Sequence, residues 1–324
     1  MVAVSVVVVT MGQSAHLATC LTSLAAQTLP DFEVITVVNG AASVIQQENA
    51  LTLAQKTRLV FTGSNVGYGA ACNVGAKVAN GPVLLFLNDD TVLQPEFLSE
   101  IHWLLSRESG CIAQPLIFHK YASAWRRGNP CDIYGAAGLA FYRGCGTGKF
   151  FVSGACLAIS KPIFQSLSGF DEKLFLYHDD LDLCWRARLR GVKVTSAVAG
   201  ICLHTGGESS TSMPHAVKFY YTQRNRIRVL IKNYSIRRLL RRLPVAVSLI
   251  FVGSAFLSMR HRTPKHTLKA FNALLWNVTT LRSTLAERRI IQATRVHGDD
   301  EIEEAMCEYS MDLCVLRRYL QDLS

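Results

Sequence analysis

The sequence predicts an α/β protein with a mostly parallel, Rossmann-like sheet flanked by helices, followed by a basic helical extension. Strand and helix patterns alternate through the first half of the chain, which is typical of parallel strands joined by helices. Polar residues directly follow the predicted strands, at the edge where such sheets bind ligands. Near residue 235 the pattern changes to helices rich in arginine. We therefore expect one domain at residues 1–235 and a separate helical region at residues 236–324.

The individual elements are predicted from the spacing of apolar residues. Val4 to Val9 is a continuous β-branched run, as expected for a strand that is buried on both faces. Apolar residues between Leu17 and Leu24 recur at helical spacing. Further strands are expected at residues 32–38, 58–62, 82–87, 151–160, 192–198 and 201–203, and further helices at residues 69–78 and 181–190. This order predicts that Thr10, Asn39 and Asp89 lie at the carboxyl ends of strands.

The net charge of +10 is concentrated in one basic block. Residues 218–297 contain seventeen basic side chains, and Glu287 is the only acidic one among them. Such a block attracts polyanions, either lipid headgroups or nucleic acid. The ten cysteines form no CxxC pair, which argues against a zinc ribbon or a thioredoxin-like motif. No basic leader precedes the first strand, so the expected compartment is the reducing cytosol.

Two adjacent acids, Asp89 and Asp90, follow Asn88 at the end of a predicted strand. Adjacent carboxylates are unfavourable unless a cation neutralises them, and their hard oxygens suit Mg²⁺ or Mn²⁺. The alternative is a solvated turn that caps the next helix, a position that also favours aspartate. His204 follows a strand and precedes a glycine pair, so it is a candidate nitrogen ligand for the same ion, although a lone histidine is usually structural.

A second acidic cluster, residues 177–182, lies just before a predicted helix and has the sequence Tyr-His-Asp-Asp-Leu-Asp. One of its acids is a candidate general base that removes a proton from an acceptor hydroxyl. The alternative is that these acids only complement the helix dipole. Residues 61–75 are rich in glycine but match neither the dinucleotide fingerprint nor the P-loop. They predict either a flexible loop or a backbone that approaches a nucleotide closely.

Four motifs in a fixed order carry a resemblance to a known family, although each is weak alone. They are Thr10 with Asn39-Gly40; Asn65-x-Gly67-Tyr68-Gly69-x-x-x-Asn73-x-Gly75 with Asn88-Asp89-Asp90-Thr91; Ser153-Gly154-Ala155-Cys156 with Gly169-Phe170-Asp171-Glu172 and Tyr177-His178-Asp179-Asp180; and His204-x-Gly206-Gly207 with Tyr220-Tyr221-x-x-Arg224-Asn225. Over about residues 3–230 the chain resembles family 2 glycosyltransferases with the GT-A fold. Within that family it is most similar to the rhamnosyltransferase-like branch, which builds bacterial surface polysaccharides.

The resemblance implies a role for each matching residue. Asp90 would bind the metal, Mn²⁺ or Mg²⁺, on the diphosphate, with Asn88 at the family's first acidic position and His204 completing the metal site. Asp180 would be the catalytic base, and Asp179 stands where the family usually has glutamate. The resemblance places nucleotide-sugar contacts at Thr10, Asn39, Asn65, Gly67, Asn73, Asn88, Asp89, Gly154 and Ala155.

The implied activity is inverting, metal-dependent hexosyl transfer from a nucleotide-diphosphate donor, dTDP-rhamnose-like or a UDP-sugar, to a glycan or lipid-linked acceptor. Val38 stands where relatives usually have an aspartate that contacts the base or ribose, so the nucleotide is left open. The Gln-x-x-Arg-Trp motif of processive members is absent, which predicts transfer of one sugar or a few. Three alternatives remain: a catalytically inactive relative, a nucleotidyltransferase, and a nucleic-acid-binding protein, for which no binding motif is present.

The segment from Pro244 to Met259 is largely apolar, sixteen residues long and flanked by basic residues on both sides. A membrane-spanning helix needs about twenty residues. We therefore expect a helix that lies in the headgroup region of an anionic membrane surface, which places the protein peripherally on the inner, cytoplasmic face. The alternative is a helix buried against the catalytic domain. No nucleic-acid partner is expected, and the sequence leaves the oligomeric state open.

Overall fold

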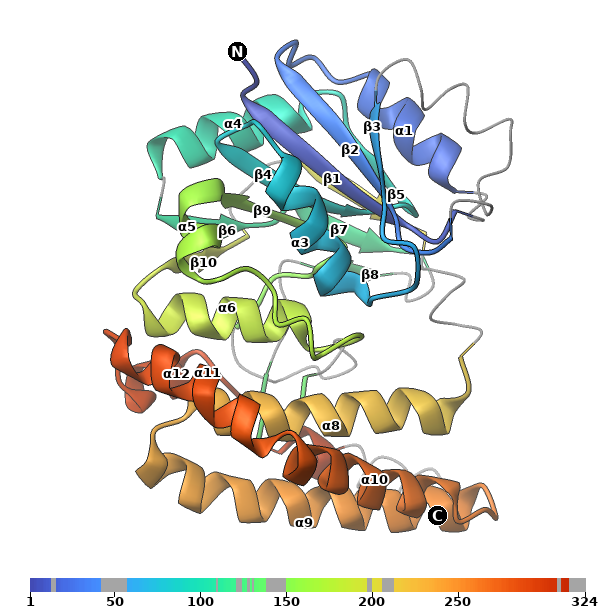
Figure 1. Ribbon diagram of the computed structural model, residues 1–324, viewed down its shortest axis with the longest axis vertical. Helices are drawn as coiled ribbons and strands as arrows, with labels where there is room; N and C mark the ends of the chain where they lie inside the picture. The colour runs from blue at the N-terminus through green and yellow to red at the C-terminus, as the bar shows by residue number, and fades with distance from the viewer. Residues whose placement is uncertain are drawn as a thin grey trace. The chain divides into compact units, whose positions relative to one another are not determined.

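A computed structural model of the chain describes residues 1–12, 16–41, 57–108, 110–120, 124–126, 129, 131–137, 150–196, 200–205, 213–307 and 310–314. The chain divides into two compact units (Figure 1). The sheet unit comprises Met1–Gly128, Val152–Cys184 and Val192–Thr211, and the helical unit comprises Asn129–Phe151, Trp185–Gly191 and Ser212–Ser324. The domain boundary expected near residue 235 falls inside the helical unit. The division at that residue stays a prediction.

The sheet unit contains a seven-stranded sheet in the order β10-β6-β9-β4-β1-β2-β3. Its strands are β1 (Val4–Thr10), β2 (Phe32–Val38), β3 (Thr57–Phe61), β4 (Val83–Asn88), β6 (Cys111–Ala113), β9 (Cys156–Ser160) and β10 (Lys193–Thr195). β1 lies between β2 and β4 and is parallel to both, and β2 is parallel to β3. β9 is antiparallel to its two neighbours, β4 and β6. The mostly parallel α/β sheet predicted from the sequence is confirmed (Figure 1).

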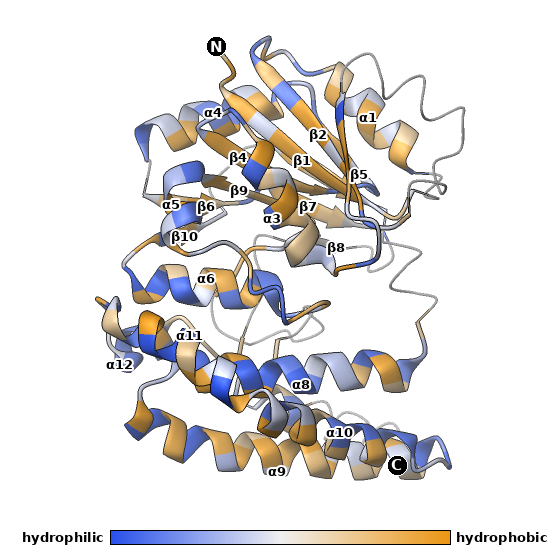
Figure 2. Ribbon diagram, in the orientation of Figure 1, coloured by the Kyte–Doolittle hydropathy of each residue, from blue (hydrophilic) through white to orange (hydrophobic). Residues whose placement is uncertain are grey.

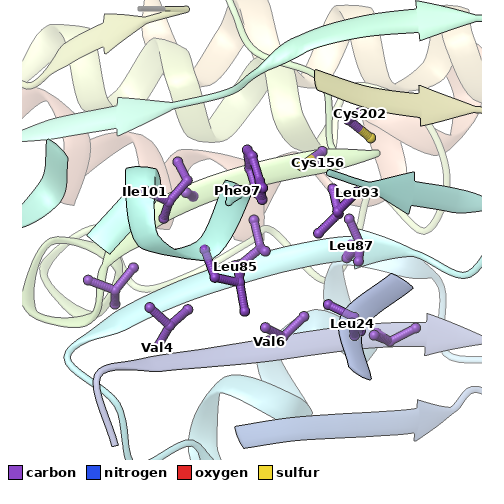
Figure 3. Close-up of a cluster of buried hydrophobic side chains, with 14 of the residues drawn as sticks. Val4, Val6, Leu24, Leu85, Leu87, Leu93, Phe97, Ile101, Cys156 and Cys202 are labelled. Carbon is purple, nitrogen blue, oxygen red and sulfur yellow. The ribbon is translucent and has the colours of Figure 1, made fainter. Parts of the chain in front are cut away.

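Helices cover both faces of this sheet. They are α1 (Leu17–Ala25), α3 (Tyr68–Val78), α4 (Phe97–Arg107) and α5 (Lys161–Ser166). The first half of α6 (Asp179–Leu189) also belongs to the sheet unit. Side chains of α1 and α4 belong to the same buried cluster as Val4, Val6 and Leu85 (Figure 3). α3 approaches the sheet so closely that a Cβ at Gly75 would lie 2.4 Å from Cγ1 of Val7. Full burial of one large apolar side chain stabilises the fold by about 1.5–3 kcal/mol. This core therefore holds in place the strands whose ends carry the polar residues.

A second, four-stranded sheet has the order β5-β11-β7-β8. Its strands are β5 (Thr91–Leu93), β7 (Leu116–His119), β8 (Ala124–Arg126) and β11 (Ile201–His204). β11 is antiparallel to β5, and their register sets His204 opposite Thr91. Since Thr91 directly follows Asp90, this pairing brings His204 to the acidic pair despite the long separation in sequence.

The helical unit is built mainly from helices in its described part. These include α8 (His215–Asn233), α9 (Ile236–Arg260), α10 (Lys265–Thr279), α11 (Leu281–Ala293) and α12 (Asp299–Glu304). α10 packs against α8 and α9, and α11 packs against α8. Arg226, Arg228 and Lys232 are buried within this unit; Arg226 pairs with Asp312 at 2.8 Å, while Arg228 and Lys232 pair with Glu287 at 2.6 and 3.1 Å. Fewer charges of the basic block are therefore available to an outside polyanion than the sequence suggests.

The apolar segment expected as a sixteen-residue helix is part of a longer one. Ser235 caps α9 by accepting the N–H of Arg238, so the helix begins at Ile236 and has 25 residues, with Pro244 inside it. Within the described residues, α9 is the one helix long and apolar enough to cross a membrane (Figure 2), although a core helix of a soluble protein can pass the same test. The expected length of sixteen residues is therefore wrong, because the helix begins before its apolar segment. The expected placement of this segment on the membrane surface stays a prediction.

Two expected strands are shorter in the structure. β9 begins at Cys156 rather than at residue 151, because Gly154 and Ala155 form a turn before it. The strand expected at residues 192–198 is described for Lys193–Thr195, and its residues 197–199 lie outside the described part of the chain. The turn before β9 bears on the site because it is hydrogen-bonded to the end of β4.

Candidate active site

The carboxyl ends of β1, β2 and β4 form the edge at which the predicted site residues gather. Thr10 ends β1, Asn39 directly follows β2, and Asn88 ends β4. The N–H of Asn39 donates to the carbonyl of Thr10 at 2.8 Å, which joins the first two strand ends. Thr10 is buried, and its hydroxyl accepts the N–H of Gly12 at 3.0 Å. In parallel α/β sheets this is the edge that binds ligands.

Asp90 and His204 form a candidate metal centre. Oδ2 of Asp90 lies 3.2 Å from Nε2 of His204, without the angles of a hydrogen bond. Asp90 is only 3% exposed, and neither of its carboxylate oxygens accepts a hydrogen bond from any residue that the structure describes. A buried carboxylate left in this state is unfavourable unless a cation compensates it. Two neighbouring ligands of an octahedral ion, each about 2.1 Å from it, lie about 3.0 Å apart, so the pair fits Mn²⁺ or Mg²⁺.

Backbone hydrogen bonds hold the acidic segment in place. Thr205 donates its N–H and its hydroxyl to the carbonyl of Asp90, at 3.0 and 2.9 Å. The N–H of Asn88 donates to the carbonyl of Ala155 at 3.1 Å. Asp89 lies between these two anchored residues and is half-buried. The turn before β9 is therefore attached directly to the end of β4.

Asp180, near the start of α6, contacts the same turn. Its Oδ2 accepts the N–H of Gly154 at 2.9 Å, and its Oδ1 accepts the N–H of Leu181 at 2.8 Å. Burial raises the pKa of Asp180, while these two hydrogen bonds oppose the rise. The carboxylate is held in one orientation and is more basic than an ordinary aspartate, which are the two properties that a general base needs.

Asp179 precedes this residue and lies deeper. It is 7% exposed, and its Oδ2 accepts no hydrogen bond from the described residues. Burial, together with the neighbouring charge of Asp180, raises the pKa of Asp179 to about 7. Because the two carboxyl groups interact, they titrate as a pair. Carboxyl groups with raised pKa values concentrate at functional sites.

Asp179→Asn should stabilise the protein more at pH 8 than at pH 5. The folded protein keeps a proton on this carboxyl up to about pH 7, whereas the unfolded chain releases it near the ordinary pKa of 3.8. Stability therefore falls as the pH rises through this window, and asparagine removes the loss. Thermal unfolding of both proteins at the two pH values, without divalent ions, measures the difference. An equal change in melting temperature at both pH values would contradict the raised pKa.

The loop before α6 has a strained backbone. Phe175, Tyr177 and His178 have left-handed φ angles of 63°, 68° and 66°. Such angles are uncommon for residues with large side chains, and they cluster at functional sites. The carbonyl of Phe175 accepts the N–H of Tyr68 at 3.0 Å, and a Cβ at Gly67 would lie 2.4 Å from the same oxygen. Only glycine fits at position 67, whose φ of 91° also favours it.

The amides of three predicted site residues make hydrogen bonds within the protein. Oδ1 of Asn39 accepts the N–H of Val66 at 2.9 Å, and its Nδ2 donates to Oδ1 of Asn65 at 3.1 Å. Nδ2 of Asn73 donates to the carbonyl of Phe170, and its Oδ1 accepts the N–H of that residue, both at 2.9 Å. These bonds fix the glycine-rich loop and the turn after it. Direct contacts of these residues with a nucleotide sugar stay predictions.

Sequence reasoning misses two residues that position the turn before β9. The hydroxyl of Tyr68 donates to the carbonyl of Gly154 at 2.6 Å. Oε1 of the buried Gln114 accepts the N–H of Ser153 at 2.6 Å. Tyr68 lies between two glycines of a recognised motif, so the sequence could have marked it as a site residue. Gln114 lies in a segment without a recognisable sequence motif, so nothing in the sequence marks it.

A family model described as "Glycosyltransferase like family 2" matches residues 2–227 of the chain. The chain belongs to this family. Among curated relatives, the O-antigen biosynthesis protein RfbC of Myxococcus xanthus is 31% identical over 221 residues, which are 62% of this chain and 17% of that protein. The dTDP-rhamnosyl transferase RfbF of Shigella flexneri is 23% identical over 197 residues, which are 56% of this chain and 65% of that protein. The chain thus spans less than two thirds of either relative, and its rhamnosyltransferase relative is distant.

Two solved structures resemble this family 2 glycosyltransferase. The crystal structure of S. aureus TarS 1-349 in complex with UDP-GlcNAc has a TM-score of 0.59 and 17% identity, covering 93% of this chain and 90% of that chain. The crystal structure of GalNAc-T7 with UDP, GalNAc and Mn²⁺ has a TM-score of 0.59 and 15% identity, covering 72% of this chain and 49% of that chain. At these identities the likeness concerns the fold alone, and it confirms the predicted GT-A architecture.

Proposed function

We propose that this family 2 protein is an inverting, metal-dependent glycosyltransferase that transfers a sugar from a nucleotide-diphosphate donor to a glycan or lipid-linked acceptor in surface polysaccharide synthesis. One observation carries the proposal: two acidic groups converge at one edge of the sheet. The buried Asp90 lies beside His204, and Asp180 contacts the turn that is bonded to the end of β4. A departing diphosphate needs compensation of its charge, and an acceptor hydroxyl needs a base. This edge supplies a group for each.

The relatives support the class of substrate. RfbC is named for O-antigen biosynthesis, and RfbF is named as a dTDP-rhamnosyl transferase. TarS was crystallised with UDP-GlcNAc, and GalNAc-T7 with UDP and Mn²⁺. We extend these properties to this chain: the donor is a UDP-sugar or is dTDP-rhamnose-like, and the cation is Mn²⁺ or Mg²⁺.

The proposed reaction is a single displacement. Asp180 takes the proton of the acceptor hydroxyl, whose oxygen bonds to the anomeric carbon as the bond from that carbon to the diphosphate breaks. Attack from the face opposite the diphosphate inverts the configuration. The N–H groups of Gly154 and Leu181 keep the carboxylate in one orientation during the transfer. Asp90 and His204 would hold the cation, which when bound stabilises negative charge on the leaving diphosphate.

The test is incubation of the full chain with UDP-, dTDP- and GDP-sugars and Mn²⁺, followed by measurement of nucleotide release with and without acceptor. We expect one donor to release its nucleotide far faster than the others, and EDTA to stop the release. Nucleotide binding without release from any donor would favour the inactive relative that Val38 and Asn88 leave open. Release of pyrophosphate from a nucleoside triphosphate and a sugar phosphate would instead indicate a nucleotidyltransferase.

We also propose that the chain works at the cytoplasmic membrane surface, with α9 and α10 against the lipid headgroups. The apolar side chains that are more than half exposed on these helices include Leu240, Val252 and Met259 on α9, and Leu268, Phe271 and Leu275 on α10. The rings of Phe251 and Phe271 lie 4.8 Å apart, which joins the two helices. Exposed apolar surface that is grouped in this way is typical of interaction sites.

Charge supports an anionic membrane as the partner. Arg237 and Arg241 are exposed in the first turns of α9. Arg238 and Arg242, from the same predicted basic flank, instead pair with Glu303 of α12 at 3.5 and 2.9 Å. The two exposed arginines remain available to lipid phosphate, and each is worth about 1 kcal/mol near an anionic surface.

The full chain should float with vesicles that contain anionic lipid, and this binding should weaken as salt rises. Phe271→Glu should reduce flotation strongly, because it places a charge on the apolar surface. Trp103→Glu, on α4, is the matched control and should bind as the parent does; Trp103 is 58% exposed and Phe271 is 56% exposed. Equal binding to neutral vesicles would favour insertion of α9 into the bilayer. Binding to no vesicles would contradict the proposal.

A further inference from the structure

Three histidines from three helix ends meet within the helical unit. His215 is the first residue of α8, His261 directly follows α9, and His266 lies in the first turn of α10. One ring nitrogen of each lies within 4.8 Å of the other two. Nδ1 of His215 and Nε2 of His266 are 2.9 Å apart. The predicted active site uses none of these residues.

The turn that presents two of these histidines is fixed by its own hydrogen bonds. The N–H of Thr263 donates to the carbonyl of Ser258 at 2.9 Å. The hydroxyl of Ser258 accepts the N–H of Thr267 at 3.1 Å. The side chain of His266 is 3% exposed and packs against the ring of Phe219, with centroids 5.8 Å apart. His261 and His266 are thus held near each other by the turn itself, and α8 supplies the third ring.

We propose that His215, His261 and His266 bind a transition-metal ion of the zinc class. Imidazole nitrogen is a preferred ligand of Zn²⁺, Cu²⁺ and Ni²⁺, and three histidines with one open position form a known zinc arrangement. Ligands about 2.0–2.1 Å from a tetrahedral ion lie about 3.3 Å apart. The 2.9 Å pair is close to this spacing, and the nitrogens of all three rings lie within 4.8 Å of one another, so the third ring must move closer to complete the set.

A metal ion binds the free lone pair of a neutral ring nitrogen, so zinc would replace the hydrogen bond that now joins His215 and His266. The bound ion would link the first turn of α8, the end of α9 and the first turn of α10.

This site and the one at Asp90 differ in the metal they select. Carboxylate oxygen suits Mg²⁺ and Mn²⁺, whereas an all-imidazole set suits zinc and its neighbours. In an Asp90→Asn background the first site is weakened, so zinc bound by that protein reports on the histidines. The outcome does not depend on transferase activity, so it is independent of the proposed function.

The experiment uses the full chain without a histidine tag, stripped of metal by a chelator, in the Asp90→Asn background. Calorimetric titration should show one Zn²⁺ per chain, and Co²⁺ should give the visible absorption bands of a tetrahedral site. His261→Gln and His215→Gln, each at an exposed position, should weaken zinc binding at least tenfold. His102→Gln, on α4, is the matched control and should bind as the parent does.

Thermal unfolding completes the test, because an ion that binds only the folded chain raises its melting temperature. Zinc should raise the melting temperature of the parent and of His102→Gln, but not that of His261→Gln. All variants should melt together without metal. Absence of zinc binding by the Asp90→Asn protein, or undiminished binding by both histidine variants, would overturn the proposal.

Discussion

Replacing Asp180 by asparagine should lower the turnover number by about 10²–10⁴, because general-base catalysis contributes roughly that factor. Asparagine cannot take the acceptor proton, yet its single carbonyl oxygen can keep one of the two backbone hydrogen bonds now made to Gly154 and Leu181. Donor binding should therefore change little. Single-turnover kinetics with the preferred donor measures the rate, and nucleotide titration measures the binding.

Asp179→Asn is the control for this experiment, because Asp179 is the adjacent carboxylate and is more deeply buried. We expect it to retain far more activity than Asp180→Asn. An inactive Asp179→Asn protein together with an active Asp180→Asn protein would assign the catalytic base to Asp179 instead. Melting temperatures of both variants separate a loss of chemistry from a loss of fold.

Replacing Asp90 by alanine should abolish turnover and the part of nucleotide binding that depends on a divalent cation. Asp90 is the buried carboxylate whose oxygens accept no hydrogen bond from the described residues, so its removal deletes a metal ligand without breaking a side-chain hydrogen bond of the fold. Titration of a nucleoside diphosphate with Mn²⁺ or with EDTA measures the effect directly. His204→Ala should weaken the metal dependence in the same direction. Full activity of the parent protein in EDTA would contradict both expectations.

The fold class and the acidic residues could be predicted from the sequence, but their arrangement could not. The uninterrupted apolar run of β1 identifies a buried parallel strand, and acids that follow a strand or precede a helix stand out locally. The proximity of Asp90 to His204, however, depends on the antiparallel pairing of β11 with β5. The contact of Asp180 with Gly154 depends on β9 lying beside β4. Local spacing does not encode such long-range pairings.

The burial of charges in the helical unit could not be predicted from composition. A count of charged residues does not show which side chains are buried, so Arg226 and Arg228 would be expected on a solvated basic surface although both are buried. It also cannot show that the arginine-rich turns before Pro244 continue into the apolar helix. The three histidines give no sequence signal as a group, because two of them share a turn and the third begins a helix far before it.

Under the proposed function, the contact between Gly67 and Phe175 couples donor recognition to acceptor activation, so the two cannot evolve independently. The glycine-rich loop and the strained loop that leads to Asp180 touch backbone to backbone, with no side chain between them to absorb a displacement. A shift of the first loop that admits a different nucleotide sugar is passed directly to the second. Adoption of a new donor in this lineage would therefore need compensating changes on the acceptor side, and a chimera that exchanges one loop alone should lose the alignment between base and sugar.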